Sequence, residues 1–240
     1  MNALKVSRLP ALTCLFVFLL CLNSCAGDTE ELISGALAKG ADVNAKTKYG
    51  LTALMRASSA GDLAAVKELI AKGADVNAKT NDGGTALMRA SSAGYLDIVK
   101  ELLAKGADVN AKAKYGMTAL MQASSAGHLD VVKELIAKEA DVDAKTNDGL
   151  TALMRASSAG HLDVVKELLA KGADVNGKAN DGWTALMAAS DEGRLDIIQE
   201  LLAKGADVSA KTNDGTTALS AARRNAHNDI AWVLINSGAR

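Results

Sequence analysis

Two of the three histidines, His128 and His161, lie 33 residues apart. Histidine is a common zinc ligand, and each coordinating nitrogen must lie about 2.0–2.1 Å from the metal. If this spacing places the two histidines on neighbouring stacked helices, these helices are roughly 8–10 Å apart, which argues against a shared ion. Each histidine follows a glycine, so we expect both to organise a turn. The third histidine, His227, follows His161 at twice this spacing.

Serine pairs recur at the same interval: Ser58-Ser59, Ser91-Ser92, Ser124-Ser125 and Ser157-Ser158. A serine nucleophile needs a base within hydrogen-bond reach and a third group that orients this base. A serine that is repeated four times in a regular lattice is expected at a helix end. The pattern therefore predicts no catalytic residue and no enzymatic activity.

The segment Asp75-Val76-Asn77 and its copies resemble the start of a calcium-binding loop. Lys79 stands where a third oxygen ligand is needed, Thr80 replaces the required glycine, and no acid closes the loop at its twelfth residue. We therefore expect no metal site and no cofactor.

These candidates all belong to a longer regular pattern. The tripeptide Thr-Ala-Leu begins at Thr52, Thr85, Thr118, Thr151, Thr184 and Thr217. Ala-Asp-Val follows the same 33-residue interval, with Asp42, Asp75, Asp108, Asp141, Asp174 and Asp207. A fixed period of this length is typical of stacked-repeat proteins, in which no repeat can bury its apolar face alone.

Each repeat is predicted to form two short helices. Thr151 can cap the first helix, which ends near Gly160. Asp163 lies in the first turn of the second helix, Lys171 in its last turn, and Gly172 follows. An acid early, a base late and a glycine afterwards is the order that the helix dipole and a left-handed C-cap favour.

The side chains of these helices predict the core. The second helix carries one apolar stripe at helical spacing, made of Leu162, Val165, Leu168 and Leu169. The first helix buries small residues such as Ala152 and Ala156, so neighbouring repeats can approach closely. Asn-Asp-Gly turns, which begin at Asn81, Asn147, Asn180 and Asn213, predict hairpin loops between repeats.

The segment from Thr146 to Lys178 contains four short motifs: Gly149-Leu150-Thr151-Ala152-Leu153-Met154-Arg155-Ala156, Gly160-His161, Val165–Leu169 and Gly172-Ala173. These resemble the ankyrin-repeat pattern of Gly-x-Thr-Pro-Leu-His-x-Ala, Gly-His, Val-x-x-Leu-Leu and Gly-Ala. The resemblance implies an all-α solenoid of helix-turn-helix units with hairpin loops, about six and a half repeats long.

The resemblance covers nearly all of the chain after residue 27. Its expected units are a half repeat at 28–46, full repeats at 47–79, 80–112, 113–145, 146–178 and 179–211, and a shorter repeat at 212–240. The proline of the family pattern is alanine throughout, which gives up some preorganisation of the first helix. Glu139 replaces the glycine after the second helix of the third repeat, where we expect a strained left-handed conformation.

Residues 1–24 have the layout of a secretory signal. Lys5 and Arg8 form a basic start, and the apolar run from Ala11 to Leu22 is too short to span a membrane comfortably. Leu22-Asn23-Ser24-Cys25 resembles the lipobox of bacterial lipoproteins, in which the cysteine is acylated and becomes the first residue. By this resemblance we expect residues 25–240 to form the mature chain, with palmitate on Cys25.

The location of the mature chain follows from the same segment. Ala26 after the cysteine favours the outer membrane, by resemblance to enterobacterial lipoproteins. The alternative is cleavage after Ala26, because Ser24-Cys25-Ala26 also fits a small-x-small cleavage site. That cleavage would give a secreted protein with no lipid.

Cysteine usage and charge exclude several kinds of partner. Cys14, Cys21 and Cys25 are the only cysteines, so the repeats cannot form a disulfide or a cysteine metal site. The chain has 27 basic and 28 acidic residues, and removal of Lys5 and Arg8 with the signal leaves a formal charge of −3. This charge offers no footprint for nucleic acid and no polybasic patch for a membrane surface. Membrane attachment must therefore come from the lipid.

A binding surface remains as the predicted function. Ankyrin proteins resemble one another in binding partners through hairpin tips and the inner face of the first helix. The second, third and fifth residues of each repeat vary most here and include three of the five aromatic residues beyond the signal. Exposed tyrosine and tryptophan contribute strongly to interfaces. We therefore predict partner contacts from Tyr49, Leu51, Tyr115, Met117, Leu150 and Trp183.

Two further features have alternative interpretations. Tyr49 and Tyr115 could instead be copies from one duplication that only cover hairpin backbone. The row of Arg56, Arg89, Gln122 and Arg155 on the first helices either presents a basic stripe to an acidic partner or forms a solvated row. Trp232 lies where earlier repeats have lysine or glutamine, and we expect it to cap the end of the array.

The sequence as a whole predicts a bacterial ankyrin-repeat lipoprotein of the periplasm. We expect a monomer that binds an unidentified protein partner, with no small-molecule substrate. Six repeats of 8–10 Å each would extend roughly 50–60 Å from the membrane. Two other functions fit the sequence: a secreted effector that acts on a host protein, and an accessory factor that stabilises a periplasmic enzyme without a lasting complex.

Overall fold

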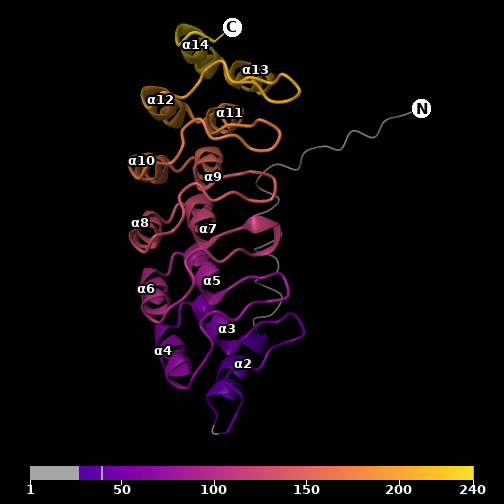
Figure 1. Cartoon of the computed structure of the whole chain (residues 1–240), viewed down its shortest axis with the longest axis vertical. Helices are drawn as coiled ribbons and strands as arrows, with labels where there is room; N and C mark the ends of the chain where they lie inside the picture. The colour runs from indigo at the N-terminus through magenta and orange to yellow at the C-terminus, as the bar shows by residue number, and fades with distance from the viewer. Residues whose placement is uncertain (1–26, 39, 240) are drawn as a thin grey trace, which may run out of the picture.

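The computed structural model describes residues 27–38 and 40–239 of the 240-residue chain. These residues form an elongated stack of short helices that follow one another in chain order along the long axis (Figure 1). The signal predicted at residues 1–24 and the lipid site predicted at Cys25 lie outside the described residues.

The described residues contain α-helices and one 3₁₀ turn, and no β-strand. The array begins with α2 (Gly27–Leu37). The first helices of the repeats are α3 (Ala53–Ala60), α5 (Ala86–Ala93), α7 (Ala119–Ala126), α9 (Ala152–Ala159), α11 (Ala185–Asp191) and α13 (Ala218–Arg224). The second helices are α4 (Leu63–Ala71), α6 (Leu96–Ala104), α8 (Leu129–Ala137), α10 (Leu162–Ala170), α12 (Leu195–Ala203) and α14 (Asn228–Asn236), and the 3₁₀ turn η1 spans Lys114–Gly116.

The predicted caps define the ends of the first helices. The Thr151 side chain accepts a hydrogen bond from the Met154 N–H, as the N-cap of α9. The same helix ends at Gly160, whose φ of 87° is left-handed and whose N–H donates to the Ala156 carbonyl. Glycine adopts this conformation without a steric penalty, so the helix can stop after eight residues.

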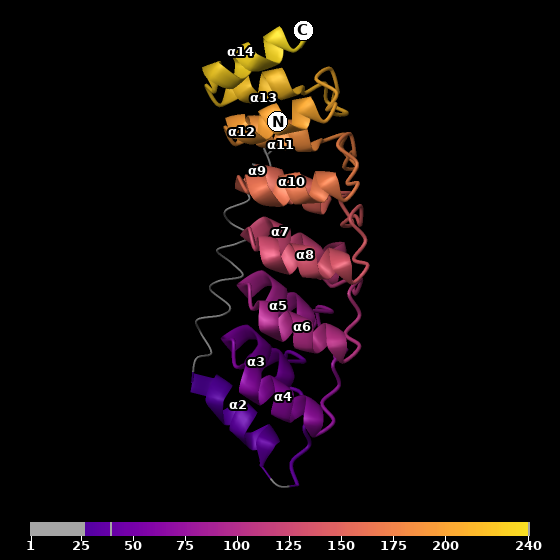
Figure 2. The same cartoon turned by 90° about the vertical axis from the view of Figure 1, so that its left-hand side faces the viewer.

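The helices form two parallel columns. In Figure 1 the first helices stand in one column, the second helices stand beside it, and the loops between repeats project from the opposite side. Figure 2 shows the same helix pairs stacked from α3 and α4 to α13 and α14. Each first helix packs against the first helices of its neighbours, as α5 does against α3 and α7.

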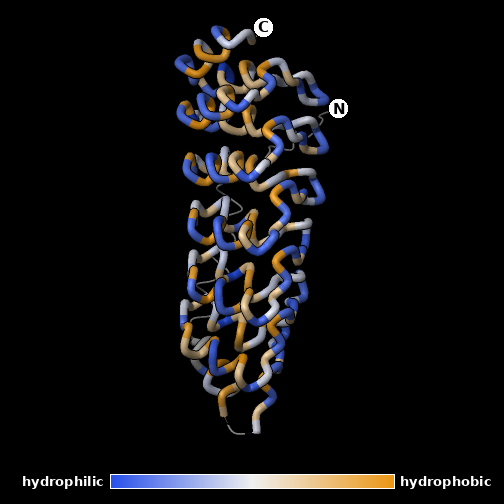
Figure 3. The backbone as a smooth tube through the Cα atoms, turned by 60° about the vertical axis from the view of Figure 1, so that its left-hand side comes forward, coloured by the Kyte–Doolittle hydropathy of each residue, from blue (hydrophilic) through white to orange (hydrophobic). Residues whose placement is uncertain are grey.

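The core runs between the two columns through the length of the stack. Ala152, Leu153 and Ala156 of α9 are buried, as the small residues of the first helix predict. On α10 the buried residues are Val164, Val165 and Leu168, whereas the outer members of the predicted stripe are only half-buried. Apolar segments recur at every level of the tube in Figure 3.

The turn after each second helix contains a residue in the left-handed conformation, as predicted. Gly73, Gly106, Gly172 and Gly205 have φ values between 83° and 89° at this position. Glu139 occupies the same position in the third repeat with a φ of 65°, so the predicted left-handed conformation at Glu139 is confirmed. None of the described helices combines the length and the apolarity that a bilayer crossing requires.

Candidate functional site

The hairpin loops between repeats are closed five-residue turns. In the first loop the Thr47 N–H donates to the Leu51 carbonyl at 2.9 Å, and the Gly50 N–H donates to the Thr47 carbonyl at 2.8 Å. Gly50 has a φ of 77°, which the turn requires and which glycine adopts without strain. The second and third residues of each loop therefore lie at its tip, and the fifth residue returns to its base.

Backbone hydrogen bonds join each loop to the next. The Asn81 N–H donates to the Tyr49 carbonyl at 3.2 Å, and the Asn147 N–H donates to the Tyr115 carbonyl at 2.8 Å. The same bond joins Lys114 to Asp82, Asn180 to Asp148 and Asn213 to Asp181. We call this continuous row of second and third loop residues the tip ladder. It holds the tips as one surface along the array.

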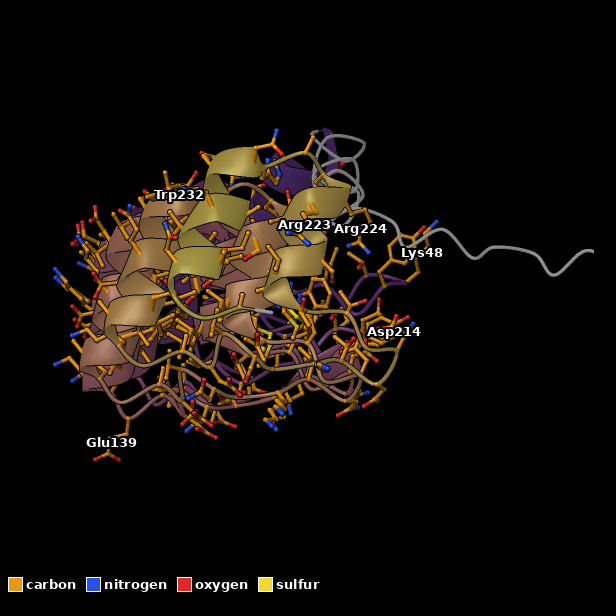
Figure 4. All side chains as sticks on the ribbon, turned by 90° about the horizontal axis from the view of Figure 1, so that it is seen from above. Lys48, Glu139, Asp214, Arg223, Arg224 and Trp232 are labelled. Atoms are coloured by element: carbon orange, nitrogen blue, oxygen red, sulfur yellow. The ribbon has the colours of Figure 1, made fainter. Side chains whose placement is uncertain are left out.

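Two tyrosines project from the tip ladder. Tyr49 is 58% exposed and Tyr115 is 61% exposed. The Lys48 Nζ lies 4.8 Å from the centre of the Tyr49 ring, and the Lys114 Nζ lies 5.2 Å from the Tyr115 ring. Figure 4 shows Lys48 at the loop side of the array, together with Asp214 of the last loop. Exposed rings with a neighbouring cation are suited to a partner that covers both.

The environment of Lys114 is electrostatically distinct. Its Nζ lies 3.6 Å from the Asp82 Oδ1 of the preceding tip. The pKa of Lys114 is raised, first by the Tyr115 side chain and then by Asp82.

The fifth loop residues are less accessible than the sequence predicted. Leu51, Met117, Leu150 and Trp183 are half-buried and pack against the core. The reason is the loop closure: the Trp183 carbonyl accepts a hydrogen bond from the Ala179 N–H at 2.9 Å, which holds Trp183 at the loop base. The prediction that Trp183 presents an exposed ring beside the tyrosines is therefore wrong.

The arginine row lies on the first helices. Arg56 and Arg89 occupy equivalent positions on α3 and α5, and both are half-buried. Gln122 on α7 and Arg155 on α9 continue the row, and the alanines that follow it at positions 188 and 221 are buried. Because the Nε atoms of the arginines are buried, the row is recessed into the helix surface and is not a fully solvated row.

The histidines organise turns, as the sequence predicted. The Nε2 atoms of His128 and His161 lie 3.1 Å from the carbonyl oxygens of Ser92 and Ser125 in the preceding repeats. His227 makes the same contact with the Asp191 carbonyl at 3.2 Å. Each ring occupies the space that a Cβ would take on the corresponding turn glycine of the preceding repeat. In the described part of the chain, no three His, Cys, Asp or Glu side chains are arranged to hold a metal ion.

The serine pairs occupy helix ends. The first serine of each pair, at positions 58, 91, 124 and 157, is fully buried within the array. The hydroxyl of the second serine in the first pair, Ser59, donates to the Met55 carbonyl at 2.8 Å in its own helix. These positions and contacts agree with the helix-end interpretation.

Sequence reasoning missed one surface at the end of the array. Trp232 is 66% exposed and Ile235, one turn later on α14, is 45% exposed. Figure 4 shows Trp232 on the side of the second helices, away from Lys48 and Asp214. The expectation that Trp232 caps the array is wrong, because its position in the repeat faces outward. The lysines at this position in earlier repeats were the available signal.

Comparison with known proteins adds one result. No curated protein matches this chain. A family model described as ankyrin repeats, three copies, matches residues 20–113, 109–179 and 175–240. Ankyrin repeats form protein–protein interaction modules, and no catalytic family is indicated. With these matches, the 33-residue period and the stack of capped helix pairs, the chain belongs to the ankyrin-repeat family.

Proposed function

We propose that this protein is a non-enzymatic, lipid-anchored scaffold that binds a protein partner in the bacterial periplasm. The observation that carries the binding function is the position of Tyr49 and Tyr115 on the tip ladder. Both rings are more than half exposed, on loops that backbone hydrogen bonds fix to their neighbours.

The energetic argument is one of preorganisation. A tyrosine offers a large contact area and loses little side-chain entropy on binding, because it has only two rotatable bonds. A loop fixed before binding does not have to be ordered by the partner, so more of the contact energy appears as affinity. Trp183 and the other fifth residues would then support the tip surface from below instead of contacting the partner at its centre.

The proposed anchor is an acyl lipid on Cys25. The features that support it are the basic start, the short apolar run and the Leu-Asn-Ser-Cys segment of residues 1–25. The first described helix begins at Gly27, and two residues of chain reach at most roughly 7 Å. An acylated Cys25 would therefore hold the α2 end of the array close to the bilayer.

Site-specific photocrosslinking in bacterial cells tests the binding surface. A benzoylphenylalanine placed at Tyr49 or Tyr115 in the full chain should yield one protein adduct of the same mass. The matched control is the same residue at Lys100, which is exposed on α6 in the other helix column. Adducts in equal yield from Lys100, or no adduct from either tyrosine, would contradict the proposed surface.

Metabolic labelling with palmitate tests the anchor separately. The full chain should incorporate label, and Cys25→Ala should abolish it. Cys21→Ala is the control, because it changes a cysteine within the predicted signal and should leave the label unchanged. An unlabelled, soluble product from the unaltered chain would instead support the secreted effector.

A further inference from the structure

The arginine row contains one closely coupled pair. Arg56 and Arg89 occupy the same position in successive repeats, on helices α3 and α5 that pack against each other. The residues on either side of Arg56, Met55 and Ala57, are buried in the core. The two arginines therefore emerge side by side on the one accessible side of the first-helix column.

This pair has no counter-ion within the described residues. The ion pairs there involve Lys72, Lys114, Lys171 and Arg224. The Nε atoms of Arg56 and Arg89 are buried and have no hydrogen-bond partner. Burial, and then the positive charge of Arg56, lower the pKa of Arg89. Two like charges are thus held together in partly buried positions, an arrangement that folding alone does not favour.

The same chain shows that the arginines are not needed for folding. Gln122 fills this position on α7 and a buried alanine, Ala188, fills it on α11, with the stack continuing through both. Both of these residues are uncharged, so they avoid the repulsion between neighbouring arginines. The remaining physical explanation for the arginine pair is an anionic partner, which neutralises both charges when it binds.

The spacing of the pair indicates the shape of that partner. Helices that pack in successive repeats lie roughly 8–10 Å apart. A polyproline II chain has three residues per turn and a rise of about 3.1 Å, so side chains three residues apart share a face and lie about 9.3 Å apart. An extended chain also approaches a recessed guanidinium more closely than an α-helix of about 10–12 Å diameter. Each carboxylate can then contact the terminal nitrogens of one arginine while its Nε stays covered.

We propose that Arg56 and Arg89 anchor an extended acidic segment of the protein partner, with a carboxylate at every third residue. This inference rests on the proposed binding function and names the chemistry of the partner. Gln122 extends the site by one repeat, because its side-chain amide can donate to a third acidic residue of the same segment.

The test uses the full chain and a fluorescent synthetic peptide of four Glu-Pro-Pro triplets, with binding measured by anisotropy. Arg56→Gln and Arg89→Gln should each weaken binding about tenfold or more, and Gln122→Arg should strengthen it. Lys67→Gln and Lys100→Gln are the matched controls. They remove the same charge from exposed positions of the same two repeats and should change affinity less than twofold at equal salt.

Thermal unfolding separates binding from folding. Arg56→Gln and Arg89→Gln should leave the melting temperature unchanged or raise it, since each removes a like-charge contact. Several results would overturn the inference: no binding of the acidic peptide, equal weakening by the lysine variants, equal binding of Gln-Pro-Pro triplets, or equal competition by single-stranded DNA. Crosslinked adducts from position 115 without binding of the acidic peptide would contradict this inference and leave the proposed function intact. Binding of the peptide without crosslinked adducts would support the arginine site and contradict the proposed binding surface at the tips.

Discussion

The side-chain amide of Asn110 donates a hydrogen bond of 3.1 Å to the backbone carbonyl of Glu139 in the next repeat. Its oxygen accepts a second bond, of 2.8 Å, from the Asp141 N–H. The same pair of bonds comes from Asn44, Asn77 and Asn176. This asparagine ladder joins the segment that follows each second helix to the residues that follow the second helix of the next repeat.

The ladder is incomplete at Asp143, which replaces asparagine in the third repeat. Asp143 still accepts from the Asp174 N–H at 2.9 Å, but a carboxylate has no hydrogen to donate to the Gly172 carbonyl. Asp143→Asn should restore that bond and stabilise the protein by about 0.5–1 kcal/mol, at the low end because the site is exposed. Urea unfolding of the two proteins measures the difference.

Asn77→Asp is the reciprocal control for this ladder. It removes the Asn77 amide donor, whose Nδ2 lies 2.9 Å from the Gly106 carbonyl oxygen, and adds a negative charge. It should therefore destabilise the protein by a similar amount. Effects of both substitutions in the same direction would contradict the predicted role of the amide donor, because each substitution is the reverse of the other.

Glu139 is strained where its counterparts are glycine. Glu139 has a φ of 65°. A residue with a Cβ in this left-handed conformation destabilises the folded protein by roughly 1 kcal/mol compared with glycine. Glu139→Gly should recover this energy and raise the melting temperature by about 2–4 °C for a chain of this size. Calorimetry of the full chain measures the shift.

Two controls isolate the backbone at this turn. Glu139→Ala removes the charge and keeps the Cβ, so it should give little of the gain. Gly106→Ala should lose about what Glu139→Gly gains, because a Cβ at Gly106 meets nothing within 4 Å and only its φ of 83° is unfavourable. A stabilising Glu139→Ala would instead assign the effect to the carboxylate.

These two positions show what the sequence could predict. The conformation of Glu139 follows from local backbone chemistry, because the glycine that recurs every 33 residues identifies a left-handed position. The threonine caps and the loop glycines were predictable for the same reason. The asparagine ladder was not, since each bond joins residues 29 or 31 positions apart and depends on how the repeats stack.

The candidate site was predictable only in part, because some of its features also depend on how the repeats stack. The residues that vary from repeat to repeat identified the loops, and Tyr49 and Tyr115 are exposed there as expected. This variation could not show that the fifth residue, Trp183, returns to the loop base. Nor could it show that the arginine row is recessed, because this depends on how closely α3 and α5 pack.

The carboxylate of Asp207 provides a prediction about pH. The Ser209 hydroxyl donates to the Asp207 Oδ1 at 2.7 Å and the Ser209 N–H donates to it at 2.9 Å. These bonds, the hydroxyl first, lower the pKa of Asp207. Its contribution to stability is therefore fully present above the ordinary aspartate pKa of about 3.9. It is lost as pH falls through the lowered pKa of the folded protein.

Ser209→Ala should raise the pKa of Asp207 and move this acid-side loss of stability to higher pH. An NMR titration that follows the Asp207 carboxyl carbon measures the change directly. Ser237→Ala is the control, because the Ser237 hydroxyl donates to the Val233 carbonyl and not to an acid. An unchanged titration midpoint in Ser209→Ala would assign the shift to the backbone bonds instead.

Tyr115 and Tyr49 occupy the same position in their loops but differ in backbone conformation. Tyr115 has a left-handed φ of 64°, whereas Tyr49 is not among the residues with positive φ. Asparagine tolerates the left-handed region far better than an aromatic residue does. Tyr115→Asn should therefore stabilise the fold by up to about 1 kcal/mol, and Tyr49→Asn should not.

If the strain at Tyr115 serves binding, Tyr115→Asn should also lower crosslinking from a benzoylphenylalanine at Tyr49. A melting temperature that falls in both variants would show that the Tyr115 backbone carries no recoverable strain.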